Sequence, residues 1–311
     1  MNFYASPQYL QLVAETYFPD RSTRIADVAL GDVVLRLLVV DDKQIVTEVP
    51  FLDYHQPLEP GEAKAVERWH GYAPAVSRTL IRSEERGTVT PEPVWAPYSD
   101  WSDFKNDDAY FDFISTRHLV TLRNLRRLRR RLEETHGPLE FTPNDRRDDV
   151  LPFAFHWKSR QFRATGVDDL FADPRNVRFF EGLRERDLLV ASTLRVGGRP
   201  LSVWLGFIHE RVWSGWIFTY DRDPVFSRYS LGHQLLQSIL RHSLQSGHRG
   251  FDHSVGGQDY KWLYATHARA LYSVGDPPPS ARTFIRQGLQ IVGLLEPARA
   301  ARKALRRLRM P

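Results

Sequence analysis

The sequence contains no cysteine among its 311 residues. This absence excludes disulfides, thiolate metal ligands and a cysteine nucleophile, and it fits a protein of the reducing cytoplasm. No uninterrupted apolar run approaches the roughly 20 residues that a membrane-spanning helix needs. The N-terminal residues also lack the basic start and apolar stretch of a signal peptide. We therefore expect a cytoplasmic protein with no integral membrane segment.

Several motifs that define enzyme classes are also missing. There is no Gly-x-Ser-x-Gly elbow, which argues against a serine hydrolase. Neither the phosphate-loop lysine motif nor the dinucleotide fingerprint occurs. His248 and His253 have no acidic partners at ligand spacing, so we expect no metal site.

The composition is that of a soluble, globular protein. Hydrophobic residues make up 42% of the chain, aromatic residues 12% and charged residues 26%, which allows a sizeable core. The length accommodates one large domain or two of about 150 residues each. The net charge is +5, and much of the basic excess lies in residues 123–131 and 299–309. These two runs form either solvated helix faces or a surface for anionic cofactors, RNA or lipid headgroups.

The apolar pattern predicts an α+β protein with mixed, mostly antiparallel sheets flanked by helices. In the first half, the expected helices cover residues 8–17, 62–70 and 116–135, and the expected strands cover residues 33–40, 44–51 and 139–142. In the longest helix Leu122, Leu125, Leu128 and Leu132 recur at helical spacing, so one stripe faces the core and arginines fill the rest. Residues 82–112 carry no pattern that assigns an element.

The second half combines helices with a meander of three strands. The expected helices cover residues 148–158, 174–186, 230–246 and 280–309, and the expected strands cover residues 188–196, 200–208, 212–220 and 250–255. Asp173-Pro174 is a good helix start, with the aspartate as the cap and the proline in the first turn. Gly197-Gly198, between two alternating apolar runs, predicts a hairpin.

Two segments after the meander carry the groups best suited to chemistry. Residues 229–240 run from a loop into an amphipathic helix, with Gly232 at the turn. The first amides of a helix lack internal partners and lie at the positive end of its dipole, so a pyrophosphate is their natural occupant. A simple tight turn is the other explanation of a lone glycine. Residues 251–261 form a short strand that ends in a glycine pair and a cluster of groups able to move protons.

Four series of residues point to a known family. They are the arginine-rich residues 123–133 followed by His136-Gly137, the pair Trp157-Lys158, the series Tyr229-Ser-Leu-Gly232 and, most specifically, Gly250-Phe-Asp-His-Ser-Val-Gly-Gly-Gln-Asp-Tyr-Lys261. Through them residues 115–265 resemble the GNAT acyltransferases, in particular the CelD-like branch associated with cellulose biosynthesis and related to the Fem aminoacyltransferases. The resemblance implies tandem GNAT-like halves: a degenerate N-terminal domain over residues 1–145 and an acyltransferase domain over residues 146–311 with a basic C-terminal helix.

The resemblance also implies where the acyl carrier binds. The carrier-binding candidates are Arg228, Ser230, Leu231, Gly232, His233 and Gln234. The usual GNAT phosphate loop carries an arginine or glutamine followed by two spaced glycines, whereas residues 228–234 contain one glycine. Acyl-CoA, such as acetyl-CoA, and the aminoacyl-tRNA used by the Fem relatives therefore both stay open as the carrier.

The chemistry implied is direct attack of an amine on a thioester carbonyl. Tyr260 is the candidate acid for the leaving thiolate, since a phenol with a pKa of about 10 suits that task, and Tyr264 is a second candidate. Asp252 either orients or deprotonates the amine or caps a turn. Lys261 neutralises a phosphate or a substrate carboxylate, or pairs with a neighbouring acid. A backbone N–H of strand 212–220 serves the oxyanion.

We therefore expect an N-acyltransferase that moves an acyl group from acyl-CoA to an amine of a small molecule, a sugar or a peptide. The first alternative is Fem-like transfer of an amino acid from a charged tRNA, in which the arginine-rich helix docks the tRNA. The second alternative is a non-catalytic binding or scaffold protein of a biosynthetic pathway.

Overall fold

The computed structural model describes residues 3–30, 33–42, 44–46, 51–53, 71–80, 94–256 and 258–274. By its internal contacts the chain separates into residues 1–274 and residues 275–311. The expected helices at residues 62–70 and 280–309 lie outside the described residues, as do residues 47–50 of the expected strand 44–51. Its last residue, Phe51, lies in a turn with positive φ and is not part of a strand. Within the described part, no helix is long and apolar enough to cross a membrane.

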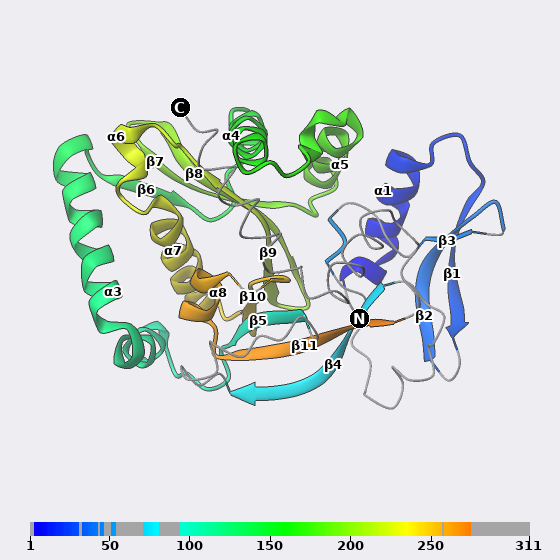
Figure 1. Ribbon diagram of the computed structural model, residues 1–311, viewed down its shortest axis with the longest axis horizontal. Helices are drawn as coiled ribbons and strands as arrows, with labels where there is room; N and C mark the ends of the chain where they lie inside the picture. Colours follow the sequence, from blue (N-terminus) through cyan, green and yellow to red (C-terminus); the bar gives the residue numbers. More distant parts are fainter. Residues whose placement is uncertain are drawn as a thin grey trace, which may run out of the picture. The chain divides into compact units, whose positions relative to one another are not determined.

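An eight-stranded sheet organises residues 71–274 (Figure 1). Its strand order is β4-β11-β5-β10-β9-β8-β7-β6. The strands are β4 (Gly71–Leu80), β5 (Val94–Asp100), β6 (Leu139–Thr142), β7 (Val190–Val196), β8 (Arg199–His209), β9 (Val212–Tyr220), β10 (Gly250–Asp252) and β11 (His267–Val274). Every neighbouring pair is antiparallel except β10 and β9, which are parallel. The predicted α+β class with a mostly antiparallel sheet is confirmed.

The meander β7–β8–β9 follows the sequence closely. Gly197 and Gly198 both have positive φ, as a two-residue hairpin between antiparallel strands requires, and Val196 pairs with Arg199 across them. Alternate residues of β8 face opposite sides of the sheet, so Val203 and Leu205 enter one core and Trp204 enters the other. The predicted strands and their connecting hairpin are confirmed here because their signals are local.

Two irregularities shape the middle of the sheet. The register between β8 and β9 shifts so that Gly206 pairs with Gly215 while Leu205 pairs with Ile217, which leaves Trp216 as the extra residue of a β-bulge. The parallel pairing of β10 with β9 covers three residues and ends at Ser214. From there β9 continues to Tyr220, past the end of β10. The predicted strand 250–255 is thus shorter than expected.

Helices cover both faces of the sheet (Figure 1). On one face lie α4 (Val150–Thr165) and α5 (Pro174–Glu185); on the other lie α3 (Asp107–His136), α7 (Leu231–Gln245) and α8 (Asp259–Tyr264), with the short α6 (Pro224–Ser227) before α7. Three of the four leucines of the predicted stripe of α3, Leu122, Leu125 and Leu132, are buried, and Leu128 is half-buried. The helix starts earlier than predicted, at Asp107, where the Asn106 side chain caps it, and His118 interrupts its helical geometry.

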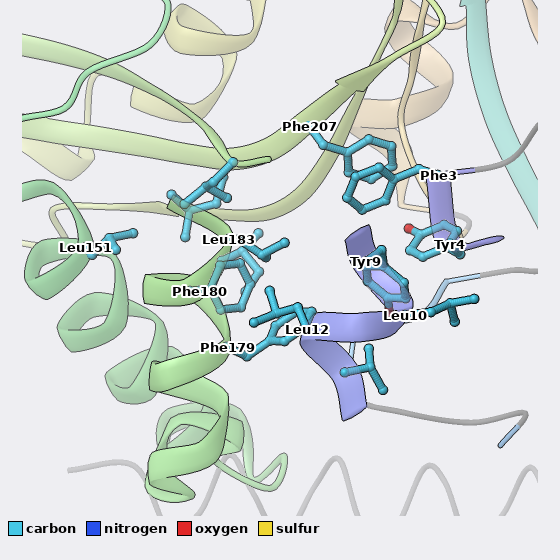
Figure 2. Close-up of a cluster of buried hydrophobic side chains, with 14 of the residues drawn as sticks. Phe3, Tyr4, Tyr9, Leu10, Leu12, Leu151, Phe179, Phe180, Leu183 and Phe207 are labelled. Carbon is cyan, nitrogen blue, oxygen red and sulfur yellow. The ribbon is translucent and has the colours of Figure 1, made fainter. Parts of the chain in front are cut away.

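The N-terminal residues pack on the face that carries α5. A short 3-10 turn, Phe3–Ala5, precedes α1 (Pro7–Tyr17), which Ser6 caps through Tyr9 N. Figure 2 shows Phe3 against Phe207 of β8, with ring centroids 3.9 Å apart in a stacked arrangement. A separate antiparallel sheet follows, in the order β1 (Thr23–Leu30), β2 (Val33–Val40) and β3 (Gln44–Val46).

Strands from both sides of residue 145 enter the large sheet, since β4, β5 and β6 precede it and the other five strands follow it. The strands β4 and β5 and the helix α8 carried no signal in the sequence. Their residues are interrupted by proline or are few, and pairing with distant strands holds β4 and β5. The expected division into halves at residues 145 and 146 stays a prediction.

Candidate functional site

A cavity of about 290 Å³ lies where β8 and β9 meet the start of α7 and one side of α8. Its wall comes from two strands, the end of α6, Ser230 before α7, and the helices α7 and α8. The lining residues are Trp204, Phe218, Tyr220, Ser227, Ser230, Leu231, Gly232, His233, Leu236 and Tyr260. Hydroxyl, amide and imidazole groups gather at the start of α7, and aromatic rings cover the strand side. The cavity therefore suits a ligand that has both oxygen acceptors and an apolar part.

The chain enters α7 through a left-handed residue. Ser230 has φ 53° and ψ 46°, its side chain makes no capping hydrogen bond, and its carbonyl accepts from Gln234 N at 3.2 Å. The preceding backbone N–H groups of this first turn, at Leu231, Gly232 and His233, have no partner inside the helix. They lie at the positive end of the helix dipole and next to the cavity, where they can donate to oxygen atoms.

Packing alone requires a glycine at position 232, whether or not a ligand is bound there. A Cβ at this position would lie 2.4 Å from the ring of Phe218, which is closer than real carbon atoms approach. Phe218 itself lines the cavity. The lone glycine of the predicted carrier loop thus lets α7 approach the aromatic wall of β9.

Four of the six predicted carrier-binding residues meet at the cavity, namely Ser230, Leu231, Gly232 and His233. The other two are engaged elsewhere. Arg228 donates to the hydroxyl of Tyr229 and lies over its ring. The buried side chain of Gln234 donates to the carbonyl of Leu125 in α3 at 2.8 Å. A role for these six residues in carrier binding stays a prediction.

Tyr260 is the predicted catalytic residue that reaches the cavity. It is the second residue of α8, and its ring lies 6.3 Å from that of Trp204. Burial raises the pKa of Tyr260 to about 12. The phenol therefore keeps its proton at neutral pH and can donate it to a developing anion.

Asp252 is the last residue of β10, Lys261 belongs to α8, and both are buried. Asp252 accepts from Ser254 N at 2.8 Å and from Arg269 at 3.0 Å. Lys261 donates to the carbonyls of Ser254 and Val255, at 3.2 and 2.7 Å, rather than to a side chain. Burial lowers the pKa of Lys261 to about 8, against the charges of Asp53 and Asp252. Both predicted residues thus shape the turn that follows β10.

A polar group that the sequence did not predict joins them there. Asp53, which is partly buried, accepts hydrogen bonds from Ser254 and from Tyr4, and Tyr4 accepts one from Trp216 of β9 at 2.6 Å. Burial raises the pKa of Asp53 to about 6, and the charge of Asp252 adds to the effect. No local signal could reveal this contact, because Asp53 and Ser254 lie 201 positions apart.

Lys158 of α4 lies on the other side of β9. Its ammonium donates to the carbonyl of Phe218 at 3.2 Å, and burial lowers its pKa to about 8. The charge of Lys158 also lowers the pKa of Lys261, so the two lysines are within electrostatic reach. We call residues 215–220, where β9 runs past the end of β10, the open part of β9. The open part of β9 is therefore flanked by the two lysines, while Asp53 supplies a carboxyl group.

His253 is set apart from this group. It is buried, its Nε2 lies 3.0 Å from the hydroxyl of Ser99, and burial lowers its pKa to about 3. It is therefore neutral at physiological pH and bonded to β5. Among the described residues, no group of three or more histidine and acidic side chains is arranged to hold a metal ion.

Three features lie around the part of β9 that runs past the end of β10. The bulge leaves Trp216 without a register partner on β8. Tyr260 offers a proton from the cavity, and Asp53 offers a carboxyl that can accept one. The bulge, a protonated phenol and a carboxyl group thus lie around the stretch where β9 runs past β10.

Comparison with known proteins finds one family match and several similar folds. Residues 120–262 match the acetyltransferase (GNAT) domain family. The crystal structure of FemX aligns with 88% of this chain and 91% of its own, at a TM-score of 0.54 and 9% sequence identity. A conserved protein of unknown function from Bacteroides thetaiotaomicron VPI-5482 aligns at a TM-score of 0.38 and 12% identity, over 68% of this chain.

The chain spans 65% of the length of the Bacteroides protein. No curated protein sequence matches the chain significantly. The likeness to FemX extends to nearly the whole of both chains and concerns the fold.

Proposed function

We propose a donor and an acceptor for this acyltransferase, whose residues 120–262 match the GNAT acetyltransferase domain. The donor is an acyl thioester of coenzyme A, and the acceptor is an amine of a small molecule, a sugar or a peptide. The observation that carries the proposal is the cavity that joins the first turn of α7 to Tyr260 beside the open part of β9. It supplies helix amides for a phosphate at one end and a proton donor at the other.

The proposed reaction is a single displacement. The amine nitrogen attacks the thioester carbon. The carbonyl oxygen, which becomes negative, accepts a hydrogen bond from the backbone N–H of Trp216. The carbon–sulfur bond breaks, Tyr260 gives its proton to the sulfur, and the second proton that the attacking nitrogen loses returns to Tyr260 through water. The acceptor amine, which arrives as an ammonium, loses its proton to Asp53 or Asp252. Lys261 and Asp252 hold the turn after β10 in the shape that this step needs.

The runner-up donor is an aminoacyl-tRNA, as the resemblance to the Fem enzymes implies. The single glycine of residues 228–234 and the length of the match with FemX favour keeping it. A non-catalytic scaffold is not retained, because the GNAT acetyltransferase domain that the chain matches is an enzyme domain.

Calorimetric titration with acetyl-CoA, and separately with a non-hydrolysable aminoacyl-tRNA analogue, distinguishes the donors. Binding of acetyl-CoA with release of free thiol in the presence of an amine library supports the proposal. Binding of the tRNA analogue alone supports the runner-up. If neither binds, both donors are wrong.

Tyr260→Phe tests the proposed acid. We expect kcat to fall about 100-fold, which is the lower end of what a positioned general acid contributes, while the affinity for coenzyme A is retained. Because the pKa of Tyr260 is about 12, the wild-type rate should show no loss of this proton across the neutral range. Stopped-flow thiol release measures the rate. Tyr17→Phe, on α1 and outside the cavity, is the matched control, and equal rates in both variants would exclude Tyr260 as the acid.

Asp53→Asn tests the carboxyl on the acceptor side. With its pKa near 6, kcat/KM of the wild type should rise with pH through that value, and the variant should lose this rise together with about 100-fold in rate. A pH–rate profile from pH 5 to 8 measures both. The exposed Asp42→Asn serves as the control. A profile of Asp53→Asn that still rises near pH 6 assigns the base elsewhere.

Although Asp53→Asn should lower the activity, it should raise the stability of the fold at alkaline pH. The folded pKa of Asp53 lies above its unfolded value, so its contribution to stability is present below about pH 4 and is lost as the pH rises through 6. The variant should therefore be the more stable protein at pH 8, by about 1 kcal/mol after allowance for partial exposure. Urea unfolding at pH 4 and pH 8 measures this difference.

A further inference from the structure

Three side chains form a hydrogen-bonded series beside the cavity. His233 and Gln237 lie on one face of α7, four residues apart, and both contact the hydroxyl of Tyr264, the last residue of α8. Gln237 Nε2 donates to Tyr264 Oη at 2.9 Å, and Tyr264 Oη lies 3.1 Å from His233 Nδ1. Tyr264 is fully buried and does not line the cavity, whereas His233 does.

The series fixes the direction of the hydrogen bonds. The buried hydroxyl of Tyr264 has one proton that needs an acceptor; Gln237 is a donor to its oxygen, so among the described contacts His233 Nδ1 is the group that can accept this proton. Burial raises the pKa of Tyr264 above its ordinary value and lowers that of His233. The hydroxyl therefore stays protonated, and the imidazole stays neutral at pH 7. A neutral imidazole that accepts at Nδ1 carries its proton at Nε2.

The other edge of the ring is the part left for the cavity. Nδ1 faces Tyr264, and within the described residues no hydrogen bond to Nε2 occurs. The neighbouring donors on the cavity wall are the first-turn amides of α7 and the hydroxyls of Ser227 and Ser230. One more N–H from His233 would extend this row of donors along the cavity.

We propose that Gln237 and Tyr264 hold His233 in its Nε2–H form, so that the ring donates one uncharged hydrogen bond to a carbonyl oxygen of the acyl carrier. The inference rests on the proposed function for the identity of that carrier. Tyr264 and Gln237 are positioning residues that act through His233. The sequence offered Tyr264 as an acid for the leaving group; in this role it keeps its proton and sets the tautomer instead.

An uncharged donor selects for a particular part of the ligand. The helix amides suit phosphate oxygens, whereas a neutral imidazole next to the apolar wall of Trp204 and Phe218 suits an amide carbonyl. The pantetheine arm of coenzyme A carries such carbonyls between its phosphates and its sulfur. His233 would thus hold the arm on its way to Tyr260.

The tautomer is tested without any ligand. In protein labelled with ¹⁵N-histidine, the signal of His233 is identified by its disappearance in His233→Gln. We expect protonated Nε2 and bare Nδ1 at pH 7 to 8, and in Tyr264→Phe a mixture of tautomers with a changed pH dependence. A proton on Nδ1, or a charged ring at pH 7, overturns the proposal.

The hydrogen bond to the carrier is tested by a pair of amide substitutions. His233→Gln places an amide nitrogen near the position of Nε2, and His233→Asn places it near Nδ1. We expect the glutamine variant to keep the affinity for coenzyme A and for pantetheine, and the asparagine variant to lose about fivefold for both, the effect of one neutral hydrogen bond. His242→Gln, on the same helix but outside the cavity, is the control.

The outcomes separate this inference from the proposed donor. Wild-type protein that binds coenzyme A, with equal affinity in the two His233 variants, overturns the hydrogen bond and leaves the donor in place. A loss toward coenzyme A but not toward pantetheine assigns His233 to the phosphates and overturns the carbonyl contact. Wild-type protein that does not bind coenzyme A overturns the donor and the contact together, while the NMR result still decides the tautomer.

Discussion

Replacing Gly206 by alanine should reduce kcat by a factor of about 100 to 1,000, the loss that follows removal of one oxyanion donor. A Cβ at this position would lie 2.0 Å from the backbone carbonyl oxygen of Ser214. Because that oxygen belongs to a strand and cannot rotate away, β8 and β9 must move apart at the bulge. The amide of Trp216, the extra residue of the bulge, would then leave its position.

The same substitution should lower the free energy of unfolding by about 1–3 kcal/mol, as overpacking of a dense interior does. Activity is therefore measured well below the melting temperature, with saturating acyl donor, so that misplacement is separated from unfolding. Ser202→Ala is the control, since Ser202 is a buried residue of the same strand whose hydroxyl has no hydrogen-bond partner. If Gly206→Ala folds, binds the donor and keeps its kcat, the oxyanion donor is not at the bulge.

Replacing Arg195 by methionine should lower the free energy of unfolding by about 3–5 kcal/mol, because it leaves buried negative charge without its main partner. Arg195 of β7 is 1% exposed and donates to Asp145 and Asp149 at distances of 2.6 to 2.8 Å. Asp145, 4% exposed, also accepts from Thr193 and Arg147. Together these contacts hold the loop between β6 and α4 against β7, the strand next to the edge strand β6.

The destabilisation should depend on pH in a defined direction. Burial alone would raise the pKa of Asp145, but hydrogen bonds from Arg147, Thr193 and Arg195 hold it well below its usual value. Its contribution to stability is therefore complete above about pH 4 and is lost as the pH falls toward the folded pKa. The difference between wild type and Arg195→Met should shrink as the pH falls below 4.

Urea unfolding from pH 3 to 7 measures this, with Arg147→Met as the control. The Arg147 side chain is 43% exposed, so its removal should cost no more than about 1 kcal/mol. Adding Asp145→Asn to Arg195→Met should recover part of the loss, since it removes the unpaired charge. A full loss that the second substitution does not relieve would point to the lost packing of the arginine side chain instead.

The meander and the helices around it could be predicted because their signals are local. The glycine pair of the β7–β8 hairpin and the capped start of α5 at Asp173 each depend on a few adjacent residues. The strand β10 was predicted too long because the turn at Ser254, a left-handed residue, depends on contacts to Asp252 and Lys261 rather than on apolar alternation.

The candidate site was predicted only in part for the same reason. Tyr260 and the first turn of α7 follow from sequence order, and they meet at the cavity. Asp53 could not be found, because its neighbours belong to distant parts of the chain and only the folded sheet brings them together. For Gly232 the sequence suggested that the backbone comes close to a ligand. The structure adds that the glycine also lets α7 come close to the ring of Phe218.

The placement of β5 affects how this protein can be divided. The strand precedes the family match at residues 120–262, yet it pairs with both β10 and β11 in the large sheet. A fragment cut at the limits of the match would leave β10 without its neighbour on that side, beside the turn that holds Asp252 and Ser254. Exposed strand edges of this kind favour pairing with other chains. The catalytic unit, as a piece of protein that can be expressed and assayed, is therefore longer than the segment that the family match identifies.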